Sequence, residues 1–354
     1  MSRRSFVGGL AGLAAGSLLP PLPTLAQPRR LPDGPPPPGL RWADMHSHHG
    51  MVPAKRNAQR TRLADDMRAS GLAVVAMKVI ADYPVLAYSP GRIVAREARA
   101  NGQFRAHFEH SVAALKARAA REGLDLVTAP GHVERALTAQ RPAIAIAAEG
   151  ADFLEGDLAY LDQAKAMGLA HLQLLHFRVN ECGDTANLAP VHGGLSDFGR
   201  DVVRACNRLG ILVDVAHCSQ RGIVQALEVS SRPLIYSHGW VSANEPQWEA
   251  RNARAIHAPL AQAIAKAGGV VGVFPIQRDI AAYAAALHEL TAAVGEDHAG
   301  IGLDIDGLGR SALPTYAGLP ALAQALEGLG MREAAVDKLM GGNYLRVLRR
   351  ALDP

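Results

Sequence analysis

Histidine and acidic side chains recur at the ends of short apolar runs along this sequence of 354 residues. The first run ends in His46-Ser47-His48, and a later run ends in Glu149. Imidazole nitrogens and carboxylate oxygens are ligands that zinc prefers, and a carboxylate that ends a buried strand must be paired or bound to a metal. A His-x-His spacing is a weak signal by itself. The interpretation therefore depends on four further residues that end apolar runs: His176, His217, His238 and Asp304.

The apolar runs alternate with amphipathic segments rich in Ala, Arg and Leu, a pattern typical of repeated strand and helix units with a parallel sheet. Eight such runs predict an α/β fold, a (β/α)8 barrel of the TIM type. The carboxyl ends of its strands surround one mouth, so residues far apart in sequence would meet there. A single histidine at a strand end is more often a core or rim residue, but a repeated register favours a metal site. The predicted strands are residues 41–46, 72–80, 143–150, 169–177, 211–218, 233–240, 269–275 and 299–307.

Strand geometry decides which histidines of the first run face the mouth. Alternate side chains point to opposite faces, so His46 and His48 share one face while Ser47 and His49 point away from it. We therefore expect His49 at most to support the site. Other histidines are interpreted as ordinary surface residues, because they lie on a helical stretch, beside helix starts or in a Gly-rich loop: His107, His110, His132, His192 and His257.

Two further segments affect the predicted topology. Residues 124–130 also predict a short strand, which we place outside the barrel because it follows a long predicted helix, residues 92–121, and has no polar residue at its end. Near the C-terminus, Gly341-Gly342 predicts a break between two helices.

Composition favours a globular protein and excludes several classes. Apolar residues make up 49% of the chain and aromatic residues only 5%, which suits an α/β protein and argues against disorder. No basic stripe interleaved with aromatic residues indicates nucleic-acid binding. Three cysteines without a Cys-x-x-Cys pair do not indicate a disulfide framework. The length allows one large barrel or two modest domains, and the lack of an internal linker favours one domain, residues 41–354.

The N-terminal segment is typical of an export signal. Residues 1–26 have a charged start with Arg3-Arg4, an apolar middle and a small-residue end, and we predict cleavage after Ala26. Arg3-Arg4 followed by Phe6 resembles a twin-arginine signal, whose translocon exports folded proteins. An ordinary secretory signal or a retained anchor stays an alternative. Residues 27–40 are proline-rich and predict an extended linker. No later apolar run is long enough to span a bilayer, so we expect a soluble periplasmic protein.

Seven segments, in order, resemble successive motifs of the membrane (renal) dipeptidase family of zinc peptidases. The resemblance covers nearly all of the chain after the proline run. It implies a (β/α)8 barrel that holds two zinc ions bridged by a glutamate, a dipeptide substrate and, as often in the family, a homodimer. The segments are "WADMHSHHG", "IAIAAEGAD", "LQLLHFRVN", "GLSDFGRDVVRACNRLGILVDVAHCS", "PLIYSHGW", "ARN" at residues 250–252 and "HAGIGLDIDG".

The resemblance also implies a role for each matching residue. One zinc would bind His46, the residue at position 48 and Glu149, and the other would bind Glu149, His217 and His238. By the same resemblance, His176 would hold substrate and stabilise the developing oxyanion, Arg251 would bind the terminal carboxylate of the substrate, and Asp304 would transfer protons near the bridging water.

The sequence departs from the family at one ligand. The family usually has His-x-Asp where this chain has His46-Ser47-His48. Zinc accepts imidazole, so metal binding should survive the change. The site becomes more positive by about one unit, which should acidify a bound water and also make the hydroxide a poorer nucleophile.

Three interpretations remain open from the sequence. The first is a dinuclear zinc dipeptidase that hydrolyses dipeptides, with acceptance of a C-terminal D-residue left open. The second is a dipeptidase-like tailoring enzyme that acts on a periplasmic peptide metabolite such as a siderophore. The third is a metal-binding barrel without catalysis.

The export signal gives the first testable prediction. Replacing both Arg3 and Arg4 with lysine should leave the precursor in the cytoplasm, because the twin-arginine translocon recognises the arginine pair. Cell fractionation followed by immunoblotting measures this. Normal delivery of the double variant to the periplasm would instead indicate the general secretory route.

Overall fold

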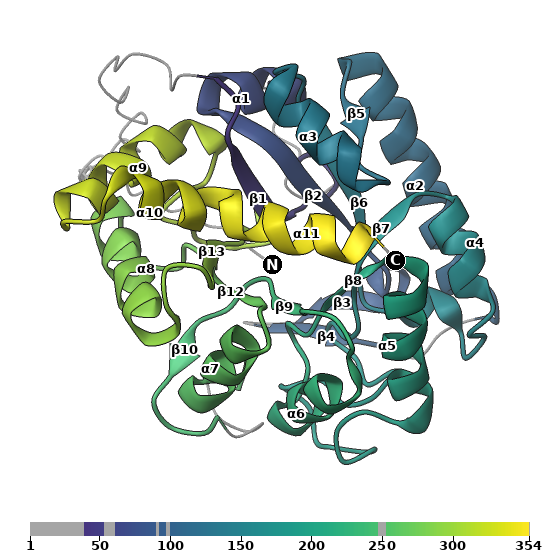
Figure 1. The fold of residues 1–354 in the computed structure, drawn as a ribbon. Coiled ribbons are helices and arrows are strands. Elements are labelled where there is room, and N and C mark those ends of the chain that lie inside the picture. The colour runs from purple at the N-terminus through teal and green to yellow at the C-terminus, as the bar shows by residue number, and fades with distance from the viewer. Residues whose placement is uncertain (1–38, 53–60, 90–91, 97–99, 247–252, 354) are drawn as a thin grey trace, which may run out of the picture. The chain divides into compact units, whose positions relative to one another are not determined.

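The computed structural model describes residues 39–52, 61–89, 92–96, 100–246 and 253–353. Its centre is a parallel sheet in which each strand hydrogen-bonds to the next, in the order β1-β2-β6-β7-β8-β9-β12-β13 (Figure 1). These eight strands lie within the eight predicted runs, except that β1 extends one residue beyond the end of its run. Their bounds are β1 (Trp42–Ser47), β2 (Leu72–Ile80), β6 (Ala143–Glu149), β7 (Leu169–Gln173), β8 (Leu212–Asp214), β9 (Ile235–Tyr236), β12 (Val270–Val273) and β13 (Ala299–Ile301).

The first strand and the segment after the last strand close the sheet into a barrel. The amide of Asp304 donates to the carbonyl of His46 at 2.9 Å, and the amide of His48 donates to the carbonyl of Ile305 at 2.9 Å. Ser47 and Ile305 form a parallel bridge between these bonds. The predicted (β/α)8 barrel is therefore confirmed, and its closure brings His46 and Asp304 side by side.

The alternation of side chains along β6 explains the direction in which the carboxylate of Glu149 points. All residues of β6 are buried. Ala145 and Ala147 pack in one apolar cluster with residues of several other strands and of two helices, α3 (Pro130–Thr138) and α11 (Asn343–Leu352), whereas Ile144 and Ile146 belong to the cluster that includes most of the surrounding helices. Since side chains alternate along a strand, Glu149 lies on the same side as the two alanines. The sequence of β6 therefore directs its terminal carboxylate into the barrel.

Helices surround the sheet, and the C-terminal helix α11 (Asn343–Leu352) lies across one end of the barrel, against β1, β7, β8, β12 and β13 (Figure 1). None of the helices among the described residues is long and apolar enough to cross a membrane. The other helices are α1 (Leu63–Ser70), α2 (Gln103–Glu122), α3 (Pro130–Thr138), α4 (Tyr160–Ala166), α5 (Asp197–Leu209), α6 (Gln220–Val229), α7 (Ala258–Lys266), α8 (Ile280–Val294), α9 (Leu319–Gly328) and α10 (Glu333–Asp337).

The predicted helix over residues 92–121 is wrong at its beginning. Residues of this stretch form β4 (Arg92–Ala95), which pairs antiparallel with β3 (Leu86–Ser89), and α2 begins only at Gln103. The β-branched Ile93 and Val94 favour a strand over a helix. The extra strand predicted at residues 124–130 is confirmed as an accessory element, because β5 (Asp125–Leu126) pairs with β6 outside the barrel order. A small parallel pair, β10 (Val241–Ser242) and β11 (Ile256–His257), was not predicted.

The predicted glycine break is present between α10 and α11. Gly341 has φ of 145°, a conformation that side-chain-bearing residues rarely adopt. A Cβ atom there would lie 2.1 Å from the backbone nitrogen of Ala43 in β1. The break therefore lets the chain pass against the first barrel strand at backbone contact distance.

Gly341→Ala should lower the free energy of unfolding by more than about 2 kcal/mol, because the new methyl group meets backbone atoms that cannot move without shifting β1. Gly328→Ala is the matched control, since a Cβ there meets nothing within 4 Å. The control should be neutral or stabilising by up to about 1 kcal/mol. Chemical denaturation measures both, and equal stabilities would contradict this account of the break.

Candidate metal centre

The predicted site residues that the structure describes converge at one end of the barrel. His46 lies in β1, His48 follows it directly, and Glu149 ends β6. The remaining four follow β7, β8, β9 and β13 by two or three residues, and all seven side chains are buried: His46, His48, Glu149, His176, His217, His238 and Asp304. Arg251 lies outside the described residues, so its predicted role stays a prediction.

One group of ligand atoms has the spacing of a metal site. The Nε2 atoms of His46 and His48 are 3.1 Å apart, and they lie 3.5 and 3.1 Å from the nearer oxygens of Glu149. Tetrahedral zinc with bonds of about 2.0 to 2.1 Å separates its ligand atoms by about 3.3 Å. These three residues therefore fit a zinc ion.

A second group shares the same carboxylate. The Nε2 atoms of His217 and His238 are 3.1 Å apart, and they lie 3.5 and 3.7 Å from Oε1 of Glu149. This spacing also matches a tetrahedral ligand set. The described ligands of both predicted sets thus lie around Glu149, but the groups of ligand atoms close enough to hold a metal also combine His46 with His238 and His176 with His217. The division into two sets and metal occupancy stay predictions.

Buried charge explains why imidazoles surround Glu149. Burial alone would raise the pKa of this carboxyl, but His176 and His46 hold it well below its usual value. Burial lowers the pKa of His46 and of His217 well below the usual range, which keeps both rings neutral. Burial also lowers the pKa of His48, but the hydrogen bond to Glu149 outweighs this and raises the pKa above its usual value. His48 therefore differs from His46 and His217, whose neutral rings are the state that metal binding requires.

Hydrogen bonds behind the rings orient most of the imidazoles. His48 donates from Nδ1 to the carbonyl of Lys78 at 2.9 Å, which fixes the ring with its Nε2 facing the site. The hydroxyl of Ser237 lies 3.3 Å from Nδ1 of His46 and 2.9 Å from Nδ1 of His238. His217 differs, because its buried Nδ1 has no hydrogen-bond partner among the described residues.

His176 is held by Asp82, a residue that the sequence analysis missed. Nδ1 of His176 lies 2.6 Å from Oδ1 of Asp82, and its Nε2 lies 3.4 Å from Oε2 of Glu149. Burial lowers the pKa of His176, but the Asp82 carboxylate overcomes this and raises the pKa above its usual value. Asp82 follows β2 by two residues, so the rule applied to the other strands would have found it.

Asp304 lies beside the first ligand set in a strained conformation. Its Oδ1 is 3.4 Å from Nε2 of His48 and 3.7 Å from Nε2 of His46. Asp304 and His217 both have positive φ, at 48° and 66°, which is uncommon for residues other than glycine and occurs often at functional sites. Burial raises the pKa of Asp304 to about 6, against the lowering effect of His48.

A buried lysine supports the site from inside the barrel. Nζ of Lys78 donates to Oδ2 of Asp214 at 2.8 Å and lies 3.0 Å from Nε2 of His171 and 3.4 Å from Oε1 of Gln173. The side-chain nitrogen Nε2 of Gln173 donates to Oε1 of Glu149 at 3.3 Å. This connects the lysine to the shared carboxylate, a link that the sequence analysis did not predict.

Asp214 also orders the two segments that carry the second ligand pair. Its Oδ1 accepts the backbone amides of Ala216 and Ser237, each at 3.0 Å. These residues directly precede His217 and His238. One buried carboxylate therefore fixes the backbone of both ligands, while Lys78 compensates its charge.

The third histidine of the opening motif, His49, points elsewhere, as the strand period predicts. Nε2 of His49 lies 3.0 Å from Oδ2 of Asp66, and Arg118 donates to its Nδ1 at 2.9 Å. The ring stacks on Tyr316 with centroids 5.9 Å apart. His49 therefore holds the end of β1 in place rather than joining the ligand cluster.

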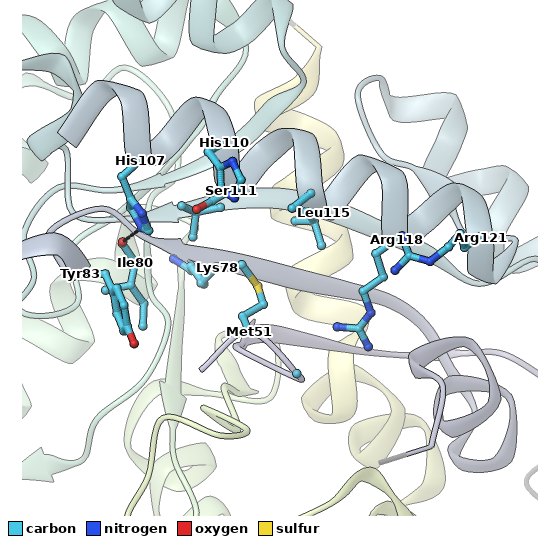
Figure 2. Close-up of a pocket in the computed structure, with 13 residues that line it drawn as sticks. Met51, Lys78, Ile80, Tyr83, His107, His110, Ser111, Leu115, Arg118 and Arg121 are labelled. Carbon is cyan, nitrogen blue, oxygen red and sulfur yellow. Dashed lines mark hydrogen bonds between the residues drawn. The ribbon is translucent and has the colours of Figure 1, made fainter. Parts of the chain in front are cut away.

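A separate cavity of about 400 Å³ lies between α2, the end of β2 and the segment after β1 (Figure 2). Its wall includes His107, a half-buried residue whose Nε2 lies 3.1 Å from the carbonyl of Ile80. His110 and His192 are exposed, as predicted. None of the predicted metal ligands lines this cavity.

Comparisons with known proteins converge on one family. The family model described as membrane dipeptidase (peptidase family M19) matches residues 93–353, which leaves His46 and His48 outside the matched range. Dipeptidase tcpJ of Claviceps purpurea (strain 20.1) is 30% identical over 218 residues, covering 58% of this chain and 50% of the relative. Dipeptidase 3 of Mus musculus is 30% identical over 242 residues, covering 64% and 48%. The chain thus spans about half the length of these curated relatives.

Solved structures support the fold independently. The crystal structure of a metallo peptidase from Rhodobacter sphaeroides, liganded with a phosphinate mimic of the dipeptide L-Ala-D-Ala, has a TM-score of 0.75 and 21% sequence identity, covering 89% of this chain and all of that chain (100%). At this identity the likeness shows the shared barrel fold.

The two neighbouring histidines provide a test of the site. His48→Ala should remove one ligand and release a metal ion, whereas His49→Ala should lower metal affinity by less than about tenfold, through displacement of the strand end. Metal content per chain after dialysis against a weak chelator measures this. Loss of metal from the His49 variant but not from the His48 variant would show that the assignment of this strand is off by one residue.

Proposed function

The chain belongs to the membrane dipeptidase family, peptidase family M19, and from this premise we propose that it is a dipeptidase that uses two zinc ions. The observation that carries the proposal is the position of Glu149, whose oxygens lie 3.1 to 3.7 Å from four imidazole Nε2 atoms arranged as two pairs. A single carboxylate between two imidazole pairs suits a shared ligand of two metal ions. The first pair is His46 and His48, and the second is His217 and His238.

Zinc ions bound there would act as Lewis acids on the scissile carbonyl and lower the pKa of water. The protein supplies the remaining chemistry. His176 is held by Asp82 with Nε2 turned toward Glu149, so it can donate a hydrogen bond to the carbonyl oxygen of a substrate as negative charge develops. Asp304, with a pKa raised by burial to about 6, can accept the proton of the attacking water and pass it to the leaving amine.

We propose, from the family resemblance, that Arg251 binds the substrate, and a guanidinium suits this role because it forms bidentate hydrogen bonds with a terminal carboxylate. We propose dipeptides with a free C-terminus as substrates, including those with a C-terminal D-residue. The Rhodobacter sphaeroides structure, whose ligand mimics L-Ala-D-Ala, supports testing the D-series.

The imidazole of His48 in place of a carboxylate is the feature that favours a specialised substrate. A neutral ligand leaves the centre more positive, which changes the ionisation of water and the strength of the nucleophile together. For this reason a tailoring reaction on a secreted peptide metabolite remains the second candidate function. Activity on simple dipeptides distinguishes the two.

The cellular setting is part of the same proposal. The N-terminal segment supports export by the twin-arginine translocon, with the metal centre folding before the membrane is crossed. The expected product is a periplasmic enzyme after removal of residues 1–26. A homodimer is proposed from the family resemblance alone.

The decisive experiment combines metal analysis with a substrate panel. The purified protein should contain about two zinc ions per chain and hydrolyse L,L or L,D dipeptides, while C-terminally amidated dipeptides should react poorly. Glu149→Gln should lose both metal and activity, because the amide cannot replace an anionic ligand shared by two ions. Two metals without hydrolysis of any dipeptide would favour the tailoring enzyme or the non-catalytic barrel, and full metal content in Glu149→Gln would reject the shared ligand.

A further inference from the structure

Arg254 places a guanidinium directly against the second imidazole pair. Its Nη2 atom donates to Nε2 of His217 at 2.7 Å and to Nε2 of His238 at 3.1 Å. Guanidinium nitrogens are donors only, so both ring nitrogens must be acceptors. The two lone pairs that would bind a metal ion are therefore the ones that now accept from Arg254.

The surrounding structure holds Arg254 in this position. The hydroxyl of Tyr236 donates to its backbone carbonyl at 2.6 Å, and Gln220 donates to the carbonyl of the next residue, Ala255, at 2.8 Å. The guanidinium carbon lies 5.7 and 5.8 Å from the ring centroids of Phe177 and Phe274. Backbone anchors and two aromatic rings thus keep the cation at the edge of the metal centre.

The first imidazole pair has a different environment. The Nε2 atoms of His46 and His48 contact each other and the carboxylates of Glu149 and Asp304, and in the described part of the chain neither ring hydrogen-bonds to an arginine or lysine side chain. His48 is also oriented by the carbonyl of Lys78, whereas Nδ1 of His217 has no such partner in the same part of the chain. The ring nitrogens of the first pair therefore face other imidazoles and carboxylates, whereas those of the second pair already accept hydrogen bonds from the cationic side chain of Arg254.

We propose that Arg254 is an internal competitor for the second metal ion, so that the two metal positions have unequal affinity. A metal ion and a guanidinium nitrogen cannot share the same two lone pairs, so the second ion binds only as Arg254 withdraws from His217 and His238. Phe177 and Phe274 lie close enough to retain the displaced guanidinium at the mouth. This inference rests on the ligand sets of the proposed function. It means that the protein holds a single metal ion when metal is scarce.

The test is a titration of the metal-free protein with Co²⁺ against a competing chelator, with the visible absorption of bound Co²⁺ reporting the coordination of each ion. Wild type should bind one ion tightly and a second ion at least about tenfold more weakly. Arg254→Met should strengthen the second site about 10- to 100-fold, the range that corresponds to loss of a hydrogen bond to a charged group, and leave the first site unchanged. Arg254→Gln repeats the test with a polar side chain of similar length.

Arg278→Met is the matched control, because it removes the same charge from an exposed arginine that pairs with Asp279. It should titrate like the wild type. His217→Ala distinguishes failure of the second ligand set from failure of the competitor role of Arg254. If His217→Ala still binds two ions, the second ligand set and the proposed function are wrong. If His217→Ala loses the second ion while both Arg254 variants bind it with wild-type or weaker affinity, the competitor role is overturned and the ligand set stands.

Discussion

The buried carboxylate of Glu149 is the interaction on which the rest of the site depends. A charge in the barrel interior is costly unless it is paired, and here five imidazoles from four different segments surround it within 3.1 to 3.7 Å. Small residues on the same side of β6 leave room for this group. Each surrounding ring gains a fixed anion as its partner, so the carboxylate sets the positions of the ligands as well as its own ionisation.

A buried ion pair in the barrel core supports the position of Glu149. Lys78 and Asp214 are both fully buried, and they compensate each other while their remaining polar atoms are used by neighbours. The Gln173 side chain accepts a hydrogen bond from Lys78 and donates one to Glu149. Asp214 accepts the backbone amides of the residues directly before His217 and His238. Removal of either charge would leave the other uncompensated, so this pair is expected to be structural as well as supportive of the site.

The candidate metal centre is asymmetric, because its histidines differ in the groups that orient their rings. His48 and His176 each have an oriented partner behind the ring, the carbonyl of Lys78 and the carboxylate of Asp82. His217 has none among the described residues and faces Arg254 instead. Family membership predicts the donor set but does not predict this difference, because it arises from residues outside the ligand positions. The imidazole at position 48 adds to the asymmetry, since it removes one negative charge from the first ligand set.

The sequence by itself determined the barrel, its eight strands and the identity of the clustered side chains, because strand period and the position of polar residues at strand ends are local properties of the chain. The same reasoning separated His48 from His49. It failed where local patterns are ambiguous, as at β4, whose residues begin an Ala- and Arg-rich stretch that also suits a helix. Asp82 carried the signal used for the other strands and was overlooked. Only the tertiary structure could reveal the contacts of Lys78 with Asp214 and Gln173, and of Arg254 with the second imidazole pair. Those contacts join residues far apart in the chain, and their distances are set by barrel closure and loop packing, which no local pattern of residues encodes.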